Sequence, residues 1–325
     1  MPYPSHLRRT VPVSEAEVEL MTRVASLYYM EDVTQAEIAS RLSLSRPKVG
    51  RLLQKARNDG VVDIAIRTHP ALSAQLEVDL AARFRLAGVV LVADQYSQDA
   101  QRAMAARAAG DLLARSLRDG DVVAVGMGRN VGAVPDQLSR LSGRSCTFVA
   151  AMGGSPQVGT GINPNDICRR LAERFGGKAE SLYAPAYAES AASREAFMRH
   201  SDVRETLARA RLAQTALVGV GDARNDSAVV QMGCFSAAEM STMREAGAVG
   251  DILGFFFDLE GRPAGGGIGD RVVGLGADDL RAVPRVIAVS SEEGKARSVL
   301  GALRTGVVDV LVASIGTGRQ VLAAA

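Results

Sequence analysis

The sequence predicts an α/β protein in two parts, an N-terminal winged helix-turn-helix unit and a C-terminal, mostly parallel α/β domain. Two short amphipathic segments joined by a tight turn occupy residues 34–57, and from residue 88 short Val/Ile/Leu runs alternate with helical segments. A chain of 325 residues, 47% of them hydrophobic, is also long enough for two cores. We therefore expect the DNA-binding-type unit over residues 1–68, a linking helix over 69–87 and the second domain over 88–325.

The first unit carries the signals that begin three helices. Ser14 and Thr34 each stand three residues before a glutamate, which is the spacing of a capping box, so a helix should begin at each. Ser45 caps a third helix, and Pro47 stands in its first turn, where the missing N–H costs nothing. The β-branched run over residues 61–67 predicts the strand of a wing.

The third helix has an apolar face and a basic face. Val49, Leu52 and Leu53 fall at helical spacing and should face a core, whereas residues 41–57 carry six Arg or Lys side chains and no acid. In a helix-turn-helix the start of this helix enters the major groove, where Arg and Lys donate to guanine or to phosphates. The alternative is an ordinary helical hairpin with a solvated basic face. The residues expected to contact DNA are Thr34, Gln35, Ser45, Arg46, Pro47, Lys48, Arg51 and Lys55.

Composition narrows the class of partner and the compartment. The net charge is only +2, so any attraction to nucleic acid must be local to the N-terminal segment. Aromatic residues make up 4% of the chain and tryptophan is absent, which disfavours a stacking platform and leaves duplex DNA as the better partner. The three widely spaced cysteines are typical of buried thiols in a reducing cytoplasm, and no secretory or membrane-spanning run is present.

The linking helix, expected over residues 71–85, has one apolar stripe. The stripe could pair with a second chain or pack on the next domain, and a single short stripe favours the domain. Its members recur every four residues and are Leu72, Leu76, Leu80 and Phe84.

The second domain should be built on a parallel sheet with helices between the strands. The expected strands are residues 88–93, 121–126, 146–151, 181–184, 215–220, 285–290 and 307–313. Residues 247–252 and 254–261 predict a separate strand pair with a turn at Glu260-Gly261. Because ligands bind at the carboxyl ends of strands in such sheets, the loops after the strands are the expected site.

Those loops are rich in glycine, which lets backbone amides approach an anion. With Arg129 and Lys295 nearby, a phosphorylated or polyhydroxyl ligand would fit; alternatively, the glycines only make tight turns. Two nucleotide motifs fail: Val131 replaces the third glycine of a dinucleotide fingerprint, and Gly294-Lys295 lacks the other residues of a P-loop. The loops therefore predict a ligand site, without a nucleotide cofactor.

Catalytic chemistry has little support in the sequence. The three histidines lie outside the loops, so we expect no histidine-based triad, no metal centre and no cofactor. Asp222, Asp251 and Asp258 could act as a base, although such acids more often cap helices or bind hydroxyls. Lys295 could form a Schiff base, but a phosphate contact or a surface position is the commoner role.

Several segments, taken in order, resemble the SorC family of bacterial transcriptional regulators, which is sometimes grouped with DeoR-type sugar regulators. The resemblance spans about Met21 to Leu322. It implies a winged helix-turn-helix, an effector domain similar to sugar-phosphate isomerases and glucosamine-phosphate deaminases, and dimers or tetramers on operator DNA. The matching segments are TQAEIASRLSLSRPKVGRLLQKARNDGVVDIAI, GMGRNVGAV, AMGG, LAERFGGKAESLYAPA, LVGVGD, GAVGDILGFFFD and EGKARSVLGALRTGVVDVLV.

The resemblance also implies roles for single residues. The loop from Gly126 to Val131 corresponds to a phosphate loop, although it reads Met-Gly-Arg-Asn where the family usually carries Ser or Thr hydroxyls. Ala313-Ser314 likewise replaces a Thr-Asp pair common in the family. Together with the strand-end loops, the resemblance gives these candidate effector-binding residues: Gly126, Met127, Gly128, Arg129, Asn130, Gly153, Gly154, Gly221, Asp222, Asp251 and Lys295.

The sequence therefore favours a cytoplasmic, homodimeric or homotetrameric transcription factor. A carbohydrate, polyol or sugar phosphate bound in the second domain would control its affinity for operator DNA. The first alternative is an enzyme that acts on sugar phosphates. The second is a constitutive DNA-binding protein whose C-terminal domain only oligomerises.

Overall fold

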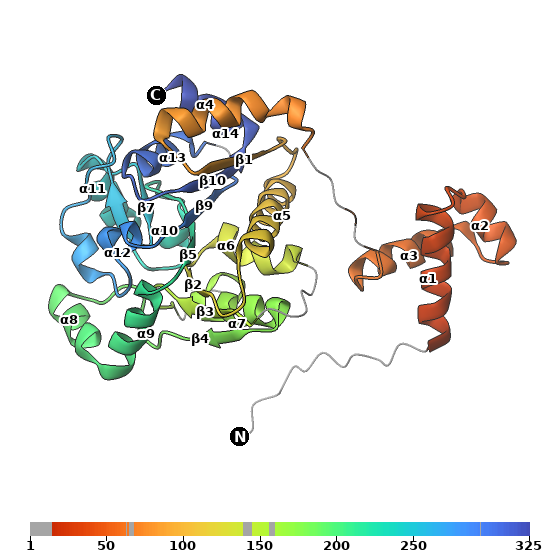
Figure 1. The fold of residues 1–325 in the computed structure, drawn as a ribbon, viewed down its shortest axis with the longest axis horizontal. Coiled ribbons are helices and arrows are strands. Elements are labelled where there is room, and N and C mark those ends of the chain that lie inside the picture. The colour runs from red at the N-terminus through yellow and green to blue at the C-terminus, as the bar shows by residue number, and fades with distance from the viewer. Residues whose placement is uncertain (1–14, 63, 65–67, 139–144, 156–159, 293) are drawn as a thin grey trace. The chain divides into compact units, whose positions relative to one another are not determined.

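The computed structural model describes residues 15–62, 64, 68–138, 145–155, 160–292 and 294–325 (Figure 1). The chain divides into two compact units, Met1–Arg67 and Thr68–Ala325. Over the described residues, no helix combines the length and the apolar character needed to cross a membrane.

The first unit is a three-helix bundle made of α1 (Glu15–Tyr29), α2 (Gln35–Arg41) and α3 (Arg46–Asn58). The predicted capping box is present, since the Glu37 amide donates to Thr34 Oγ1 at 3.3 Å and the Thr34 amide donates to Glu37 Oε2 at 3.0 Å. Ser45 Oγ likewise accepts the Lys48 amide at 3.4 Å. Ser14 and most of the predicted wing strand lie outside the described residues.

The core of this unit is the one that the helical spacing predicts. Val49, Leu52 and Leu53 of α3 are buried against Ile38 of α2 and Met21 of α1. The apolar stripes of all three helices thus meet, and the opposite face of α3 is left in solvent.

The second unit is built on a seven-stranded sheet in which every pair of neighbours is parallel. The order across the sheet is β1-β10-β9-β5-β2-β3-β4. Every residue of β9 and β10 is buried, and because alternate side chains point to opposite faces, both faces must be covered. The strands are β1 (Gly88–Val92), β2 (Val122–Val125), β3 (Thr147–Ala150), β4 (Lys178–Glu180), β5 (Thr215–Gly219), β9 (Val286–Ser290) and β10 (Val310–Ser314).

Helices cover the two faces of the sheet (Figure 1). The linking helix α4 packs on β1 and α14, so its stripe serves the second unit; Leu80 is fully buried, whereas Leu72 precedes the helix and is 56% exposed. The helices are α4 (Ala74–Phe84), α5 (Gln98–Ser116), α6 (Arg129–Ala133), α7 (Pro164–Phe175), α8 (Ala191–Arg199), α9 (Ser201–Arg211), α10 (Ala228–Gln231), α11 (Ala237–Glu245), α12 (Ala277–Arg281), α13 (Ala296–Arg304) and α14 (Ile315–Ala323).

One predicted strand is wrong. Residues 181–184 are irregular, and the chain instead pairs with β3 through β4, three residues earlier. As β4 is an edge strand with one neighbour, it does not need an apolar sequence, and Lys-Ala-Glu suffices. Tyr183, inside the predicted strand, is 84% exposed.

A second, three-stranded antiparallel sheet lies apart from the first and consists of β6 (Gly221–Asp222), β7 (Gly250–Ile252) and β8 (Phe255–Phe257). The predicted strand pair is confirmed, but its turn is wrong. The chain reverses at Leu253-Gly254, where both residues have positive φ, and Glu260-Gly261 belongs to a later turn held by Asp258 Oδ1.

Candidate functional site

The topology itself marks one crevice in the parallel sheet. From β2 the chain runs to β3 on one side, and from β5 it runs to β9 on the other side. The strand order therefore reverses between β2 and β5, and ligands of open α/β sheets bind outside the carboxyl ends of the strands at such a point. The loops that start at Gly126 and at Val220 meet there.

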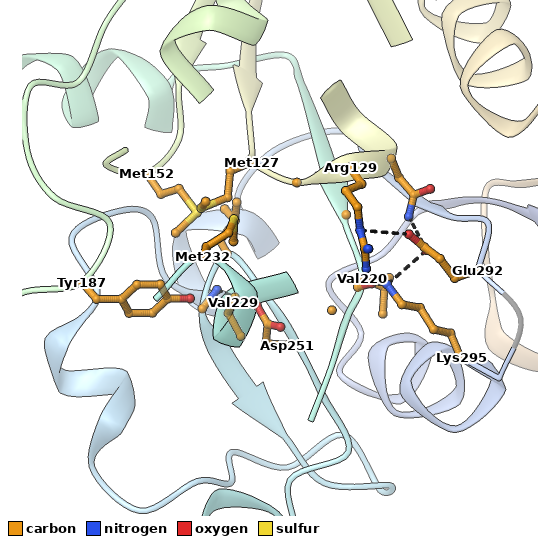
Figure 2. Close-up of a pocket in the computed structure, with 16 residues that line it drawn as sticks. Met127, Arg129, Met152, Tyr187, Val220, Val229, Met232, Asp251, Glu292 and Lys295 are labelled. Atoms are coloured by element: carbon orange, nitrogen blue, oxygen red, sulfur yellow. Dashed lines mark hydrogen bonds and ion pairs between the residues drawn. The ribbon is translucent and has the colours of Figure 1, made fainter. Parts of the chain in front are cut away.

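A pocket opens at this point, and the space between its walls and at its open mouth amounts to about 560 Å³. Figure 2 shows Met127, Met152, Met232 and Tyr187 at one end and the charged side chains of α6 and of the loop after β9 at the other. Its walls are formed by Met127, Gly128, Arg129, Asn130, Met152, Tyr187, Gly219, Val220, Gly221, Val229, Met232, Asp251, Leu253, Gly254, Glu292 and Lys295.

Seven of the eleven predicted effector residues line the cavity, namely Met127, Gly128, Arg129, Asn130, Gly221, Asp251 and Lys295. The other four lie around it. Gly126 donates its amide to Leu217 O at 2.9 Å inside the sheet, and Asp222 is buried and pairs with Arg224 at 3.4 Å. Gly153 and Gly154 pack against other segments of the same chain, residues 184–185 and Asn163, too closely to leave room for a Cβ.

Glu292 is the charged centre of the cavity, and the sequence did not single it out. The residue is 4% exposed, and its carboxylate accepts a hydrogen bond from Asn130 Nδ2 at 2.7 Å and lies 3.1 Å from Lys295 Nζ. Arg129 Nε and Arg102 Nε lie 3.9 and 4.0 Å from its other oxygen. Burial alone would raise the pKa of Glu292, but Lys295 and Asn130 outweigh it and hold the pKa below its ordinary value.

These groups form one closed network. The amide of Asn130 has a fixed orientation because its Nδ2 donates to Glu292 while its Oδ1 accepts from Ser291 Oγ at 2.5 Å. Lys295 Nζ also donates to Val220 O at 2.9 Å. The loop after β9 is thereby tied to the loops after β2 and β5, and two of the three ammonium protons of Lys295 are engaged.

Asp251 reaches the cavity from β7 because Gly221 has no side chain. A Cβ at position 221 would lie 1.8 Å from Asp251 Oδ1. Asp251 is 7% exposed, and its Oδ2 accepts the Gly254 amide at 3.0 Å, but its Oδ1 has no hydrogen-bond partner among the described residues. Burial raises the pKa of Asp251 to about 6, although the Gly254 amide and Lys295 partly oppose that rise.

Tyr187 supplies the second unpartnered polar atom. Its hydroxyl is buried, has no partner among the described residues, and lies close enough to Gly254 to contact a Cβ placed there at 2.9 Å. Burial, helped by the charge of Asp251, raises the pKa of Tyr187 well above its ordinary value. The residue comes from an irregular loop that isolated bridges to Gly154 and Val272 hold in place, so no sequence pattern marked it.

The predicted DNA-contacting residues lie at the start of α2 and on α3 or its N-cap. Arg46, Lys48 and Arg51 are exposed, and none of the three forms an ion pair with a described residue. Lys55 behaves differently: its Nζ lies 2.5 Å from Glu17 Oε1, so it ties α3 to α1. Thr34 and Ser45 are used as helix caps, Pro47 is exposed and Gln35 is partly buried.

In the described part of the chain, no three His, Cys, Asp or Glu side chains are close enough together to hold a metal ion. Cys146, Cys168 and Cys234 are not joined by disulfides; the first two are buried as predicted, whereas Cys234 is only partly buried.

Comparison with known proteins agrees with this architecture. The family model described as "Putative sugar-binding domain" matches residues 68–323. The transcriptional regulator LsrR of Klebsiella pneumoniae is 33% identical over 314 residues, which cover 95% of this chain and 94% of LsrR. The erythritol catabolism regulatory protein EryD of Brucella abortus is 26% identical and covers 95% of this chain and 98% of EryD.

Solved crystal structures are similar as well. The full-length sorbitol operon regulator SorC of Klebsiella pneumoniae is 25% identical, with a TM-score of 0.76, and covers 94% of this chain and 98% of SorC. The "Putative Sugar-Binding Domain of Transcriptional Repressor from Vibrio fischeri" is 43% identical, with a TM-score of 0.72, and covers 78% of this chain and 99% of that domain. The chain therefore belongs to the sugar-binding domain family and is a SorC-type, sugar-responsive transcriptional regulator.

Proposed function

We propose that α3 binds operator DNA, and that a small carbohydrate bound in the cavity between the ends of β2 and β5 changes the operator affinity. The protein would act in the cytoplasm. The observation that carries this proposal is the cavity at the strand-order reversal, where two buried polar atoms, Asp251 Oδ1 and Tyr187 Oη, have no described partner. Buried polar atoms are normally hydrogen-bonded, so these two are available to a ligand.

The DNA-binding half of the proposal is supported by the exposed basic residues of α3. Arg46 is the first residue of the helix, and Arg51 is exposed in the following turn. In a helix-turn-helix such residues reach base edges, and each bidentate contact to guanine contributes about 1–3 kcal/mol. We propose base contacts for Arg46 and Arg51, phosphate contacts for Lys48 and Thr34, and a lesser role for Lys55, whose ammonium is held by Glu17.

The test is fluorescence anisotropy of operator DNA from upstream of the protein's own gene, at fixed salt. Arg46→Ala and Arg51→Ala should each weaken binding by roughly 5- to 150-fold, which corresponds to about 1–3 kcal/mol. Arg23→Ala, an exposed arginine on α1, is the matched control and should bind as the wild type does. Unchanged affinity in both α3 variants would contradict the proposal.

The effector half assigns the polar contacts of the cavity. Asp251, Lys295, Asn130 and Arg129 would contact ligand oxygens, whereas Gly128 and Gly221 leave space for the ligand and for the Asp251 carboxylate. To these predicted residues we add Glu292 and Tyr187. A thermal-shift screen of sugars, polyols and their phosphates tests the site, because a ligand that binds only the folded state raises the melting temperature. Asp251→Asn should abolish the response.

Helix-turn-helix proteins read paired half-sites as dimers, so we propose that the protein binds a pseudo-palindromic operator as a homodimer or homotetramer. Light scattering of the protein with and without operator DNA measures this directly. An effector that binds the two conformational states unequally changes the operator affinity. By linkage, operator DNA then changes the effector affinity by the same factor. Unchanged affinity with every stabilising carbohydrate would favour a constitutive DNA-binding protein.

One observation favours an enzyme as the second candidate. Asp251, with its raised pKa, stands in a cavity with Lys295, and such a pair can transfer protons. Against this, the similar proteins named above are regulators. Turnover of pentose or hexosamine phosphates by the purified chain, lost in Asp251→Asn, would support the enzyme; absence of turnover with an intact thermal shift would support the regulator.

A further inference from the structure

The charges of the cavity balance within its own walls. Among the described residues, four charged side chains line it: Arg129, Lys295, Asp251 and Glu292. Both cations face the buried Glu292 carboxylate, at 3.9 and 3.1 Å. Two flanking pairs are balanced as well, since Arg102 meets Asp99 at 2.8 Å and Arg224 meets Asp222 at 3.4 Å. A ligand therefore enters a site whose formal charge is zero.

The unused hydrogen-bonding capacity points the same way. Asp251 Oδ1 is an acceptor without a described donor, and Tyr187 Oη is a hydroxyl without a described partner beside the same Gly254 turn. Lys295 keeps one ammonium proton after its contacts with Glu292 and Val220 O. A hydroxyl can both donate to a carboxylate and accept from an ammonium, whereas a phosphate dianion offers no donor.

We propose that the effector is an uncharged polyol or free sugar, not a sugar phosphate, with its hydroxyls bound by Asp251, Tyr187 and Lys295. Glu292 sets this preference because its negative charge offsets the cations that a phosphate would need. The methionines at the other end of the cavity would contact the C–H surface of the ligand (Figure 2). This inference rests on the proposed function of the same cavity.

The experiment measures binding to the full-length protein by calorimetry, using matched pairs: erythritol and erythritol 4-phosphate, ribose and ribose 5-phosphate, sorbitol and sorbitol 6-phosphate. We expect at least one free compound to bind and its phosphate to bind at least about tenfold more weakly. The phosphate would lie near the carboxylates of Asp251 and Glu292, and like charges placed together are costly. A phosphate that binds as tightly as its parent compound, or more tightly, would overturn the inference. Binding by neither member of any pair, with operator binding intact, contradicts the proposed function itself.

Two variants locate the cause. Glu292→Gln frees Arg129 and Lys295, so the preference for the free compound should shrink by at least about tenfold or reverse. Glu195→Gln, the same change at an exposed position of α8, is the control and should keep the wild-type ratio. An unchanged ratio in folded Glu292→Gln would show that Glu292 does not set the preference.

Tyr187→Phe keeps the result decisive should Glu292→Gln fail to fold. Removing a buried hydroxyl that has no protein partner should leave the melting temperature unchanged or raise it. If that hydroxyl binds the ligand, affinity for the free compound falls several-fold. A raised melting temperature with unchanged affinity would contradict the assignment of Tyr187.

Discussion

Arginine and lysine occur in both candidate sites, but their neighbours differ. On α3, Arg46, Lys48 and Arg51 are exposed and have no described acid partner, whereas Arg129 and Lys295 in the cavity both face the buried Glu292. Unpaired exposed cations suit a polyanion such as duplex DNA. Cations already neutralised inside a cavity suit a neutral ligand rich in hydroxyls. Whether the cationic side chains are paired with acids, and not which residue types they are, thus distinguishes the proposed DNA site from the proposed site for a neutral ligand.

The largest expected effect is a loss of operator binding that leaves ligand binding in the cavity unchanged. The double variant Arg46→Ala/Arg51→Ala should lose about 2–6 kcal/mol of operator binding, the sum of two base contacts. Its thermal shift with a free polyol or sugar should equal that of the wild type. Anisotropy and thermal denaturation of one preparation measure both. Loss of the ligand response together with DNA binding would mean that the variant is misfolded or that the two sites are not separate.

Gly221→Ala should disrupt the cavity. Because a Cβ would lie 1.8 Å from Asp251 Oδ1, either the carboxylate or the β6–β7 pair must move, and we expect a loss near the upper end of the about 1–3 kcal/mol typical of overpacking. Chemical denaturation measures the loss, and ligand binding should also disappear. Gly269→Ala, where nothing lies within 4 Å of an added Cβ, is the control. Equal stability of the two variants would rule out the close approach.

The ionised carboxylate of Asp251 should lower the free energy of unfolding above pH 6. Its folded pKa of about 6 exceeds its ordinary value of 3.8, so the native state binds more protons than the unfolded state between these pH values. The free energy of unfolding therefore falls as pH rises from 4 to 6, by roughly 2 kcal/mol in order of magnitude. Asp251→Asn should remove that fall and be more stable at pH 7.5. Glu292, with its lowered pKa, acts in the opposite direction only below about pH 4.5.

The matching ligand experiment uses the same pH range. Affinity for the free compound should rise from pH 5 to pH 7, as Asp251 loses its proton and becomes a stronger acceptor. A pH-independent affinity, or an Asp251→Asn variant with wild-type pH dependence of unfolding, would refute the role given to this carboxyl.

The smallest expected effect tests the different roles proposed for the two lysines of α3, a phosphate contact for Lys48 and a lesser role for Lys55. Lys48→Ala should lower the salt dependence of operator binding by about one unit of the log–log slope, as expected for one lost phosphate contact. Lys55→Ala should leave the slope unchanged and alter the affinity no more than about twofold, because Glu17 already holds this ammonium. Equal slopes for the two variants would contradict this division.

Sequence patterns found the elements whose residues must be apolar or must cap a helix. Thr34 and Ser45 bind their own local backbone, and the buried runs of β9 and β10 face helices on both sides, so spacing and composition predicted them. Edge strand β4 was missed because an edge imposes no apolar pattern.

The site was predicted only in part, for a related reason. Arg129, Asn130 and Lys295 follow strand ends, which the sequence reveals. The role of Glu292 depends on Asn130 and Arg102, which lie 162 and 190 residues away along the chain, and Tyr187 enters from an irregular loop. Which charges pair and which polar atoms stay unpartnered is decided by tertiary packing, which spacing does not encode.

The most direct test of the central claim is the operator affinity of the full-length protein with and without the free polyol or sugar that stabilises it most in the thermal-shift screen. We predict a several-fold change in the operator Kd of the wild type at saturating ligand, and no change in Asp251→Asn. An operator Kd that saturating ligand leaves unchanged in the wild type would contradict the claim that the cavity controls DNA binding.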